Sequence, residues 1–170
     1  MTSGMRPLAV LLVLMVLTVA GGEAAAALPA IGAAAPDFAS KSDSGRNVRL
    51  SELRGQVVLI NFWASWCNPC RQELPLLNKI YVQYRAAGFM LLAVNLDDNR
   101  KDAEGMLKRL DLRFPTLFDA NKNVAKLYGV DTMPATLVID RDGRVRYVHR
   151  GYYEGYERKY EQQVRELLKE

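Results

Sequence analysis

The chain is 170 residues long, carries a formal net charge of +4 and contains only two cysteines and one histidine. That length is enough for one domain with a substantial hydrophobic core. Lys and Arg are interspersed with Asp and Glu, so we expect no nucleic-acid partner, which usually needs a basic run. The chain offers no second cysteine pair, and His149 is predicted to be an ordinary surface residue, so the sequence predicts no metal site.

The N-terminus has the pattern of an export signal. Arg6 supplies positive charge, Leu8 to Ala20 is an apolar run, and Ala24 to Ala27 offers small-residue cleavage sites. The run is shorter than the about 20 residues that a helix needs to cross a bilayer, which favours cleavage. We therefore predict export to the periplasm, with an uncleaved inner-membrane anchor as the alternative. The predicted parts of the chain are a signal peptide at 1–26, a linker at 27–35 and one domain at 36–170.

Strand and helix patterns alternate along the rest of the chain. Val57 to Phe62 is a nearly continuous apolar run, as expected for a central strand covered on both faces. The element order predicts an α/β fold with a mixed β-sheet and helices on both faces. The predicted elements are extended segments at 37–38 and 48–50, a helical turn at 51–53, strand 57–62, helix 68–86, strand 89–94, helix 101–110, strand 114–118, helix 121–128, strands 135–139 and 145–149, and helix 154–169.

Three local signals refine these elements. Pro75 lies inside the first long helix and is predicted to kink it, because proline removes a hydrogen bond and crowds the preceding turn. Asp97 and Asp98 are predicted to cap the helix that follows them, which explains them more simply than a metal does. Asp142-Gly143 is a strong turn signal between the last two strands.

Both cysteines lie in a Cys-x-x-Cys spacing where the central strand gives way to a helix. Positions three apart share one helix face, so the sulfurs of Cys67 and Cys70 can reach disulfide distance. The helix N-terminus favours the thiolate of Cys67, which is therefore the expected nucleophile. A structural disulfide closing so small a loop would add little stability. Two cysteines could also form a zinc half-site or be inert buried thiols. We predict instead that Cys67 and Cys70 form a reversible dithiol/disulfide centre.

Seven segments together carry a family resemblance. They are Ala35-Pro36-Asp37-Phe38, Phe62-Trp63-Ala64-Ser65-Trp66-Cys67-Asn68-Pro69-Cys70, Cys70-Arg71-Gln72-Glu73-Leu74-Pro75, Val94-Asn95-Leu96-Asp97, Phe114-Pro115, Met133-Pro134-Ala135-Thr136 and Ile139-Asp140-Arg141-Asp142-Gly143. The cysteine segment resembles that of thioredoxin-fold proteins, and the wider set resembles the TlpA/ResA-like exported thiol-disulfide reductases over roughly residues 35–151.

The resemblance implies a thioredoxin-like fold with an N-terminal extension and a central βα insertion. It also implies a periplasmic enzyme without a cofactor that reduces disulfides of envelope proteins. Many members of the family serve cytochrome c maturation by reducing apocytochrome c, and a membrane thiol electron donor would supply the electrons.

The resemblance further assigns roles to residues around the cysteines. Glu73, three residues after Cys70, would accept the proton of Cys70, because general thioredoxins carry a buried Asp where this chain has Asn61. From spacing alone, Glu73 is equally well explained as an exposed helix residue. Asn61 is thus one departure from the pattern of the relatives, and Thr132 is a second. Many relatives have Gly at the position of Thr132, and this difference affects the shape of the substrate groove.

Three residues are predicted to bind the substrate. The bond between Met133 and Pro134 is expected to be cis and to face Cys67, and the Met133 backbone is expected to pair with an extended substrate. Trp66 is predicted to pack beside the disulfide, whereas Trp63 and Phe62 are assigned to the fold.

Two further functions remain open at this point. A thiol peroxidase of the peroxiredoxin type would carry Pro-x-x-x-Thr-x-x-Cys, which the residues ahead of Cys67, among them Trp63 and Ser65-Trp66, do not match. A copper metallochaperone would need a nearby histidine or methionine set, and only Met133 is predicted to lie close.

Overall fold

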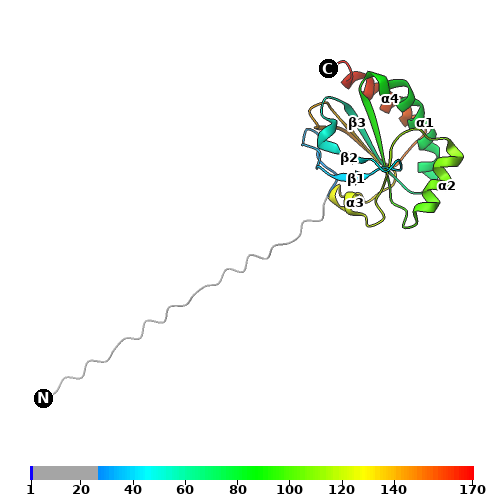
Figure 1. Cartoon of the computed structure of the whole chain (residues 1–170). Helices are drawn as coiled ribbons and strands as arrows, with labels where there is room; N and C mark the ends of the chain where they lie inside the picture. The colour runs from blue at the N-terminus through cyan, green and yellow to red at the C-terminus, as the bar shows by residue number, and fades with distance from the viewer. Residues whose placement is uncertain (2–26) are drawn as a thin grey trace.

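The computed structural model describes Met1 and residues 27–170, and the predicted signal peptide therefore lies almost wholly outside the described residues (Figure 1). The elements are β1 (Ala39–Lys41), β2 (Asn47–Arg49), the short 3₁₀ helix η1 (Leu50–Leu53), β3 (Val57–Trp63), α1 (Asn68–Tyr84), the 3₁₀ helix η2 (Arg85–Ala87), β4 (Phe89–Asn95), α2 (Arg100–Leu110), β5 (Thr116–Phe118), α3 (Asn123–Leu127), β6 (Ala135–Ile139), β7 (Val145–Arg150) and α4 (Tyr156–Leu167).

The main sheet has the strand order β5-β4-β3-β6-β7. β3 pairs with β4 in parallel and with β6 in antiparallel orientation, so the predicted mixed sheet is confirmed. All seven residues of β3 are buried, as the apolar run indicated. β1 and β2 form a separate hairpin that, with η1, is the N-terminal extension, and α2 with the edge strand β5 is the inserted unit between β4 and α3.

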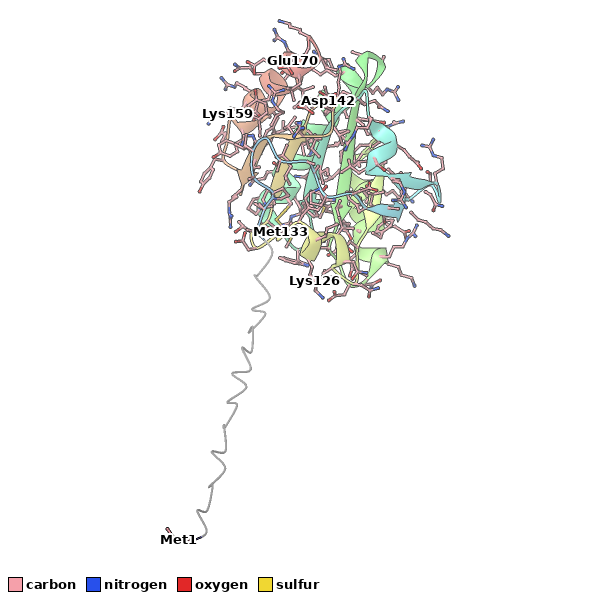
Figure 2. The ribbon with its side chains drawn as sticks, turned by 90° about the vertical axis from the view of Figure 1, so that its left-hand side faces the viewer. Met1, Lys126, Met133, Asp142, Lys159 and Glu170 are labelled. Atoms are coloured by element: carbon pink, nitrogen blue, oxygen red, sulfur yellow. A yellow bond between two sulfur atoms is a disulfide. The ribbon has the colours of Figure 1, made fainter. Side chains whose placement is uncertain are left out.

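Helices cover both faces of the sheet (Figure 1). Two hydrophobic clusters lie between the helices and the sheet, one on each face. One cluster joins α1, α2 and α4 to the sheet through residues such as Leu74, Met106 and Val164. The other cluster joins α3 and η1 to the opposite face, with Tyr128 and Leu50 fully buried. The side chains in Figure 2 fill the space between these layers. The burial of apolar surface on both faces fixes the position of β3 at the centre of the domain.

The N-terminus of α2 corrects one sequence prediction. Its cap is Asn99, whose Oδ1 accepts a hydrogen bond from the backbone N–H of Lys101 at 3.1 Å. Asp97 and Asp98 are therefore not the caps. An N-cap side chain reaches only the first helical turn, and Asn99 is the residue that directly precedes it. Asp97 is buried and turned elsewhere, while Asp98 forms an exposed ion pair with Lys122.

Local residues explain the first long helix and the turn between the last two strands. α1 continues through Pro75 as one helix. Gly143 has a φ of 75° and donates its N–H to the Asp140 carbonyl at 2.9 Å, which confirms the predicted hairpin turn.

Ahead of the domain, Gly32 and Ala35 donate hydrogen bonds to the carbonyls of Val145 and Gly143. None of the helices within the described part of the chain has the length and apolar character needed to cross a membrane.

Candidate active site

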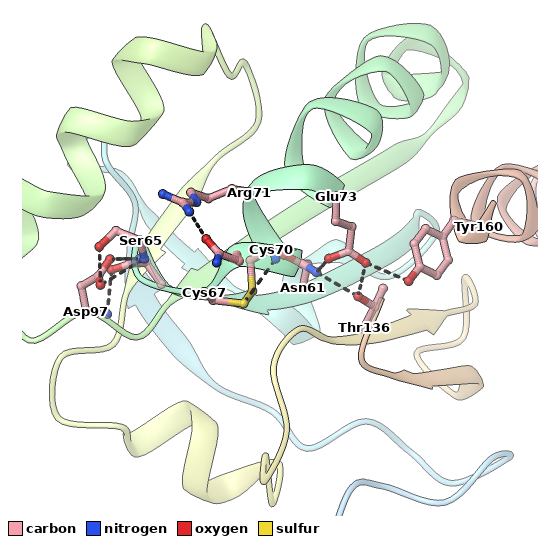
Figure 3. Close-up of a disulfide and its surroundings, with 11 residues drawn as sticks. Asn61, Ser65, Cys67, Cys70, Arg71, Glu73, Asp97, Thr136 and Tyr160 are labelled. Carbon is pink, nitrogen blue, oxygen red and sulfur yellow. Dashed lines mark hydrogen bonds between the residues drawn. A yellow bond between two sulfur atoms is a disulfide. The ribbon is translucent and has the colours of Figure 1, made fainter. Parts of the chain in front are cut away.

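The two cysteines form a disulfide at the start of α1, directly after the central strand (Figure 3). Their Cα atoms are 5.3 Å apart, which confirms that the spacing brings the sulfurs together. Cys67 is the N-cap of α1, and the N–H of Cys70 donates to Cys67 Sγ at 3.3 Å. Pro69 occupies the first turn, where its missing N–H costs no helical hydrogen bond. Cys67 is 5 % exposed and Cys70 is 0 % exposed, so Cys67 is the more accessible of the two residues.

The loop between β3 and α1 is held by a buried carboxylate. Asp97 accepts hydrogen bonds from the backbone N–H of Ser65 at 3.0 Å and from its hydroxyl at 2.9 Å. Asn95 Nδ2 donates to the same carboxylate at 2.7 Å. These contacts fix the backbone two residues ahead of Cys67. They leave the adjacent Trp66 with 67 % of its surface exposed, so most of its ring faces solvent at the rim of the site.

Glu73 is fully buried one turn after Cys70, which rules out the exposed helix glutamate that spacing alone allowed. Three side chains from three other elements surround its carboxyl group (Figure 3). Tyr160 of α4 donates its hydroxyl to Oε1 at 2.8 Å, and Asn61 of β3 donates its amide to Oε2 at 2.8 Å. Thr136 of β6 lies 3.4 Å from Oε1. The carboxyl group is thus held in a small polar pocket behind the disulfide.

This pocket changes the acidity of Glu73. Burial raises its pKa from the usual 4.5 to about 7, and the hydrogen bonds from Tyr160, Asn61 and Thr136 act in the opposite direction. A group with a pKa near 7 can accept and release a proton under ordinary conditions. In the part of the chain that the structure describes, no hydrogen bond joins Glu73 to a cysteine sulfur of the closed disulfide.

The Met133–Pro134 peptide bond is cis, as predicted. Ala135, the first residue of β6, pairs with Phe62 near the carboxyl end of β3. The Met133–Pro134 bond therefore lies at the end of the sheet from which the cysteine loop leaves β3. Met133 is half-buried and lies at the opposite end of the molecule from Asp142 in the β6–β7 turn (Figure 2). The Pro134 carbonyl accepts a hydrogen bond from Gly151 at 2.7 Å.

Trp63 and Phe62 were predicted to support the fold and not the catalysis, and both lie in the hydrophobic core. Trp63 and Phe62 are fully buried and belong to the clusters on opposite faces of the sheet. His149 is half-buried on β7 and its Nε2 lies 2.9 Å from Gln163 Oε1. Thr132 is exposed next to Met133. Among the residues that the structure places, no group of three or more His, Cys, Asp or Glu side chains could hold a metal ion.

Sequence reasoning missed two features of the site. Tyr160 and Thr136 were expected only as members of a helix and a strand, yet both contact Glu73. Asp97 was interpreted as a cap and instead holds Ser65. The available signals were the buried tyrosine on an amphipathic helix and the polar residues at the ends of buried strands.

A Cys-x-x-Cys disulfide at the first turn of the helix that follows the central strand, with a cis-proline at the same sheet edge, defines a thiol-disulfide oxidoreductase of the thioredoxin fold. Comparison with known proteins agrees. The model of the AhpC/TSA family matches residues 31–148, and the chain belongs to this family.

Relatives and solved structures carry names of the same kind. The thiol-disulfide oxidoreductase ResA of Geobacillus thermodenitrificans is 38 % identical over 122 residues, which are 72 % of this chain and 70 % of the relative. A Chlorobium tepidum structure, named as a candidate thiol:disulfide interchange protein DsbE, is 41 % identical with a TM-score of 0.78, covering 82 % of this chain and 98 % of its own. A candidate protein disulfide isomerase of Bacteroides thetaiotaomicron is 32 % identical with a TM-score of 0.77, covering 83 % and 91 %.

Proposed function

We propose that the protein is an exported reductase that opens disulfides of envelope proteins through the Cys67/Cys70 dithiol. The observation that carries this proposal is the asymmetric pair at the start of α1. Cys67 lies at the helix N-cap and keeps 5 % of its surface exposed, whereas Cys70 is fully buried one turn ahead of Glu73. An attacking sulfur and a protected resolving sulfur are the two parts that disulfide exchange requires.

The reaction proceeds in two exchange steps. The Cys67 thiolate bonds to one sulfur of a substrate disulfide, and the substrate S–S bond breaks as the other substrate sulfur leaves as a thiolate. Cys70 then loses its proton and attacks Cys67 Sγ, which closes the disulfide seen in the structure and releases the second substrate thiolate. Two electrons pass from the protein to the substrate. A thiol electron donor at the membrane then reduces the pair again.

Glu73 accepts the proton of Cys70 in the second step. The two residues share the buried face of α1, one helical turn apart, and the pKa of Glu73 is raised by burial to about 7. A carboxylate with this pKa accepts the proton in the resolving step and returns it when the pair is reduced. Because no hydrogen bond among the described residues links Glu73 to a sulfur of the disulfide form, one water molecule is the proposed carrier.

The substrate binds across Trp66, Met133 and Pro134. Trp66 exposes most of its ring directly beside Cys67, and a flat apolar surface suits packing against an unfolded polypeptide. Within the described residues, the backbone of Met133 makes no hydrogen bond to another backbone group. An extended substrate chain can therefore pair with Met133, as a strand pairs with a sheet edge.

The location and the partners follow from the N-terminal pattern and the family. The apolar segment before Ala27 is proposed to be a signal peptide that ends near residue 26, which directs the domain to the periplasm. The partners are then disulfide-containing envelope proteins, with apocytochrome c as the family's frequent substrate. The names ResA and thiol:disulfide interchange protein among the relatives favour disulfide exchange over peroxidase activity or copper transfer.

Trapping of the mixed disulfide tests this function. A Cys70→Ser variant, reduced and mixed with oxidised insulin, should accumulate a covalent complex through Cys67, because the resolving sulfur is missing. Cys67→Ser is the matched control and should give no complex. The proposal is wrong if Cys70→Ser forms no adduct with any disulfide protein, or if the adduct forms through Cys70 in the control. Measuring the reduction potential of the Cys67/Cys70 couple then decides the direction of electron flow.

A further inference from the structure

The polar pocket around Glu73 is closed by a residue from the far end of the chain. The Tyr160 hydroxyl reaches from α4 and lies 2.8 Å from Glu73 Oε1 on α1 (Figure 3). Tyr160 itself is fully buried, so its hydroxyl has no access to bulk water. We infer that Tyr160 is a positioning residue, whose hydroxyl orients the Glu73 carboxyl group and favours its ionised, proton-accepting form. This inference rests on the proposed role of Glu73 as the proton acceptor of Cys70.

The other partners of Glu73 are also arranged as donors to an anion. Asn61 presents its Nδ2 to both Glu73 and Thr136, at 2.8 and 2.9 Å. The Oδ1 atom of the same amide is buried and has no hydrogen-bond partner among the described residues. The amide is therefore turned so that its two N–H groups are used and its acceptor is not. That orientation suits a carboxylate, which only accepts hydrogen bonds.

The buried carboxyl group is stabilised by neutral neighbours. None of the ion pairs within the described chain includes Glu73. The titratable groups around the pocket are Tyr156 and Tyr160 of α4, Tyr152 ahead of α4, His149 of β7 and, in the reduced protein, Cys70 of α1. Burial lowers the pKa of His149, whose ring packs 4.8 Å from that of Tyr160, so it is neutral at neutral pH. Hydrogen bonds from neutral groups are then what stabilises the carboxylate, and Tyr160 supplies one of the two shortest.

The Tyr160 hydroxyl should lower the pKa of Glu73, because it donates its hydrogen bond to the carboxylate. A donor to the carboxylate stabilises the ionised form and lowers the pKa, against the rise caused by burial. Tyr160→Phe removes the donor and keeps the ring that packs in the core. The pKa of Glu73 should then rise by about one to two pH units, the usual size for a hydrogen bond to a charged group. The step in which Cys70 attacks should need a correspondingly higher pH.

Two measurements on the full-length protein test the inference. The first is the pKa of Glu73 in the oxidised form, followed by carbon-13 NMR of labelled glutamate carboxyl groups. The second is the pH profile of mixed-disulfide resolution in single-turnover reactions with oxidised insulin. Tyr84→Phe is the matched control, because its hydroxyl also joins α1 to α4, through Glu161 at 2.8 Å, without touching Glu73. We expect Tyr160→Phe to shift both values upward and Tyr84→Phe to shift neither.

The possible results separate this inference from the function on which it rests. An unchanged Glu73 pKa in Tyr160→Phe overturns the inference. An equal shift in Tyr84→Phe also overturns it, because the cause would then be the general packing of α4. If the Glu73 pKa rises in Tyr160→Phe alone while the pH profile of resolution stays in place, Tyr160 does position Glu73, and the proposed role of Glu73 as the proton acceptor fails.

Discussion

The carboxylate of Asp97 binds both the backbone N–H and the hydroxyl of Ser65, two residues ahead of Cys67, the proposed nucleophile. Asp97 follows the end of β4, whereas Ser65 follows the end of β3. The parallel pairing of these two strands places their carboxyl ends together, so one carboxylate can hold the loop that starts at its neighbour. The contact fixes the loop that carries Trp66 and Cys67.

Removing this contact should lower the stability of the domain. In Asp97→Ala, the Ser65 N–H and the Asn95 amide lose a buried acceptor, which we expect to cost about 1–3 kcal/mol of unfolding free energy. Urea denaturation of the oxidised protein measures this value. The adjacent Asp98→Ala is the control, because Asp98 is 95 % exposed and its ion pair with Lys122 should contribute about 0.5 kcal/mol or less. Equal losses in the two variants would contradict the structural role of Asp97.

The raised pKa of Glu73 predicts a specific dependence of stability on pH. Burial raises the folded-state pKa from 4.5 to about 7, so the folded protein holds a proton between these values that the unfolded chain releases. Stability from this group is therefore complete below about pH 4.5 and declines as the pH rises to about 7, by about 3 kcal/mol in total. The oxidised form is the one to use, because its cysteines do not titrate.

Glu73→Gln should abolish this decline. The unfolding free energy of the variant relative to the natural protein is expected to rise by about 3 kcal/mol between pH 4 and pH 8, as measured by urea denaturation. Glu104→Gln on the exposed face of α2 is the control and should show no comparable trend. A Glu73→Gln protein with the same pH dependence as the natural protein would show that folding does not raise the pKa of Glu73.

Trp66 should matter for polypeptide substrates and little for stability. Because its ring is mostly exposed, Trp66→Ala should change the unfolding free energy by about 0.5 kcal/mol or less. The KM for oxidised insulin should rise about fivefold, equivalent to about 1 kcal/mol of lost contact, while reduction of a small disulfide such as oxidised glutathione stays unchanged. A similar change with both substrates would mean that Trp66 acts on the cysteines themselves.

The two thiols of the reduced protein should differ in reactivity. Cys67 lies at the helix N-terminus with some exposure, whereas Cys70 is fully buried behind it. Limited alkylation with iodoacetamide, followed by mass spectrometry, should label Cys67 at least about ten times faster. Equal labelling would show that reduction opens the site around Cys70, and labelling of Cys70 first would reverse the assignment of the nucleophile.

The features that the sequence predicted well depend on short stretches of chain. The Cys-x-x-Cys pair, the strand ahead of it and the Asp142-Gly143 turn are local, so composition and spacing are sufficient to place them. The helix that carries Cys67 and Cys70 was likewise predicted to within two residues of its end. The wrong cap on α2 also concerns a local boundary, where Asp97, Asp98 and Asn99 are all suitable cap residues and only the backbone path selects one.

By itself, the sequence determined that two cysteines share one helix turn after a buried strand, because helical spacing and apolar runs act over a few neighbouring residues. Only the tertiary structure decided the surroundings of Glu73. Tyr160 lies 87 residues from Glu73 along the chain and Asn61 lies 12 residues from it. They meet because α1 and α4 pack on the same face of the sheet that contains β3. Burial and hydrogen bonding then set the acidity of the carboxyl group, and neither can be read from a spacing.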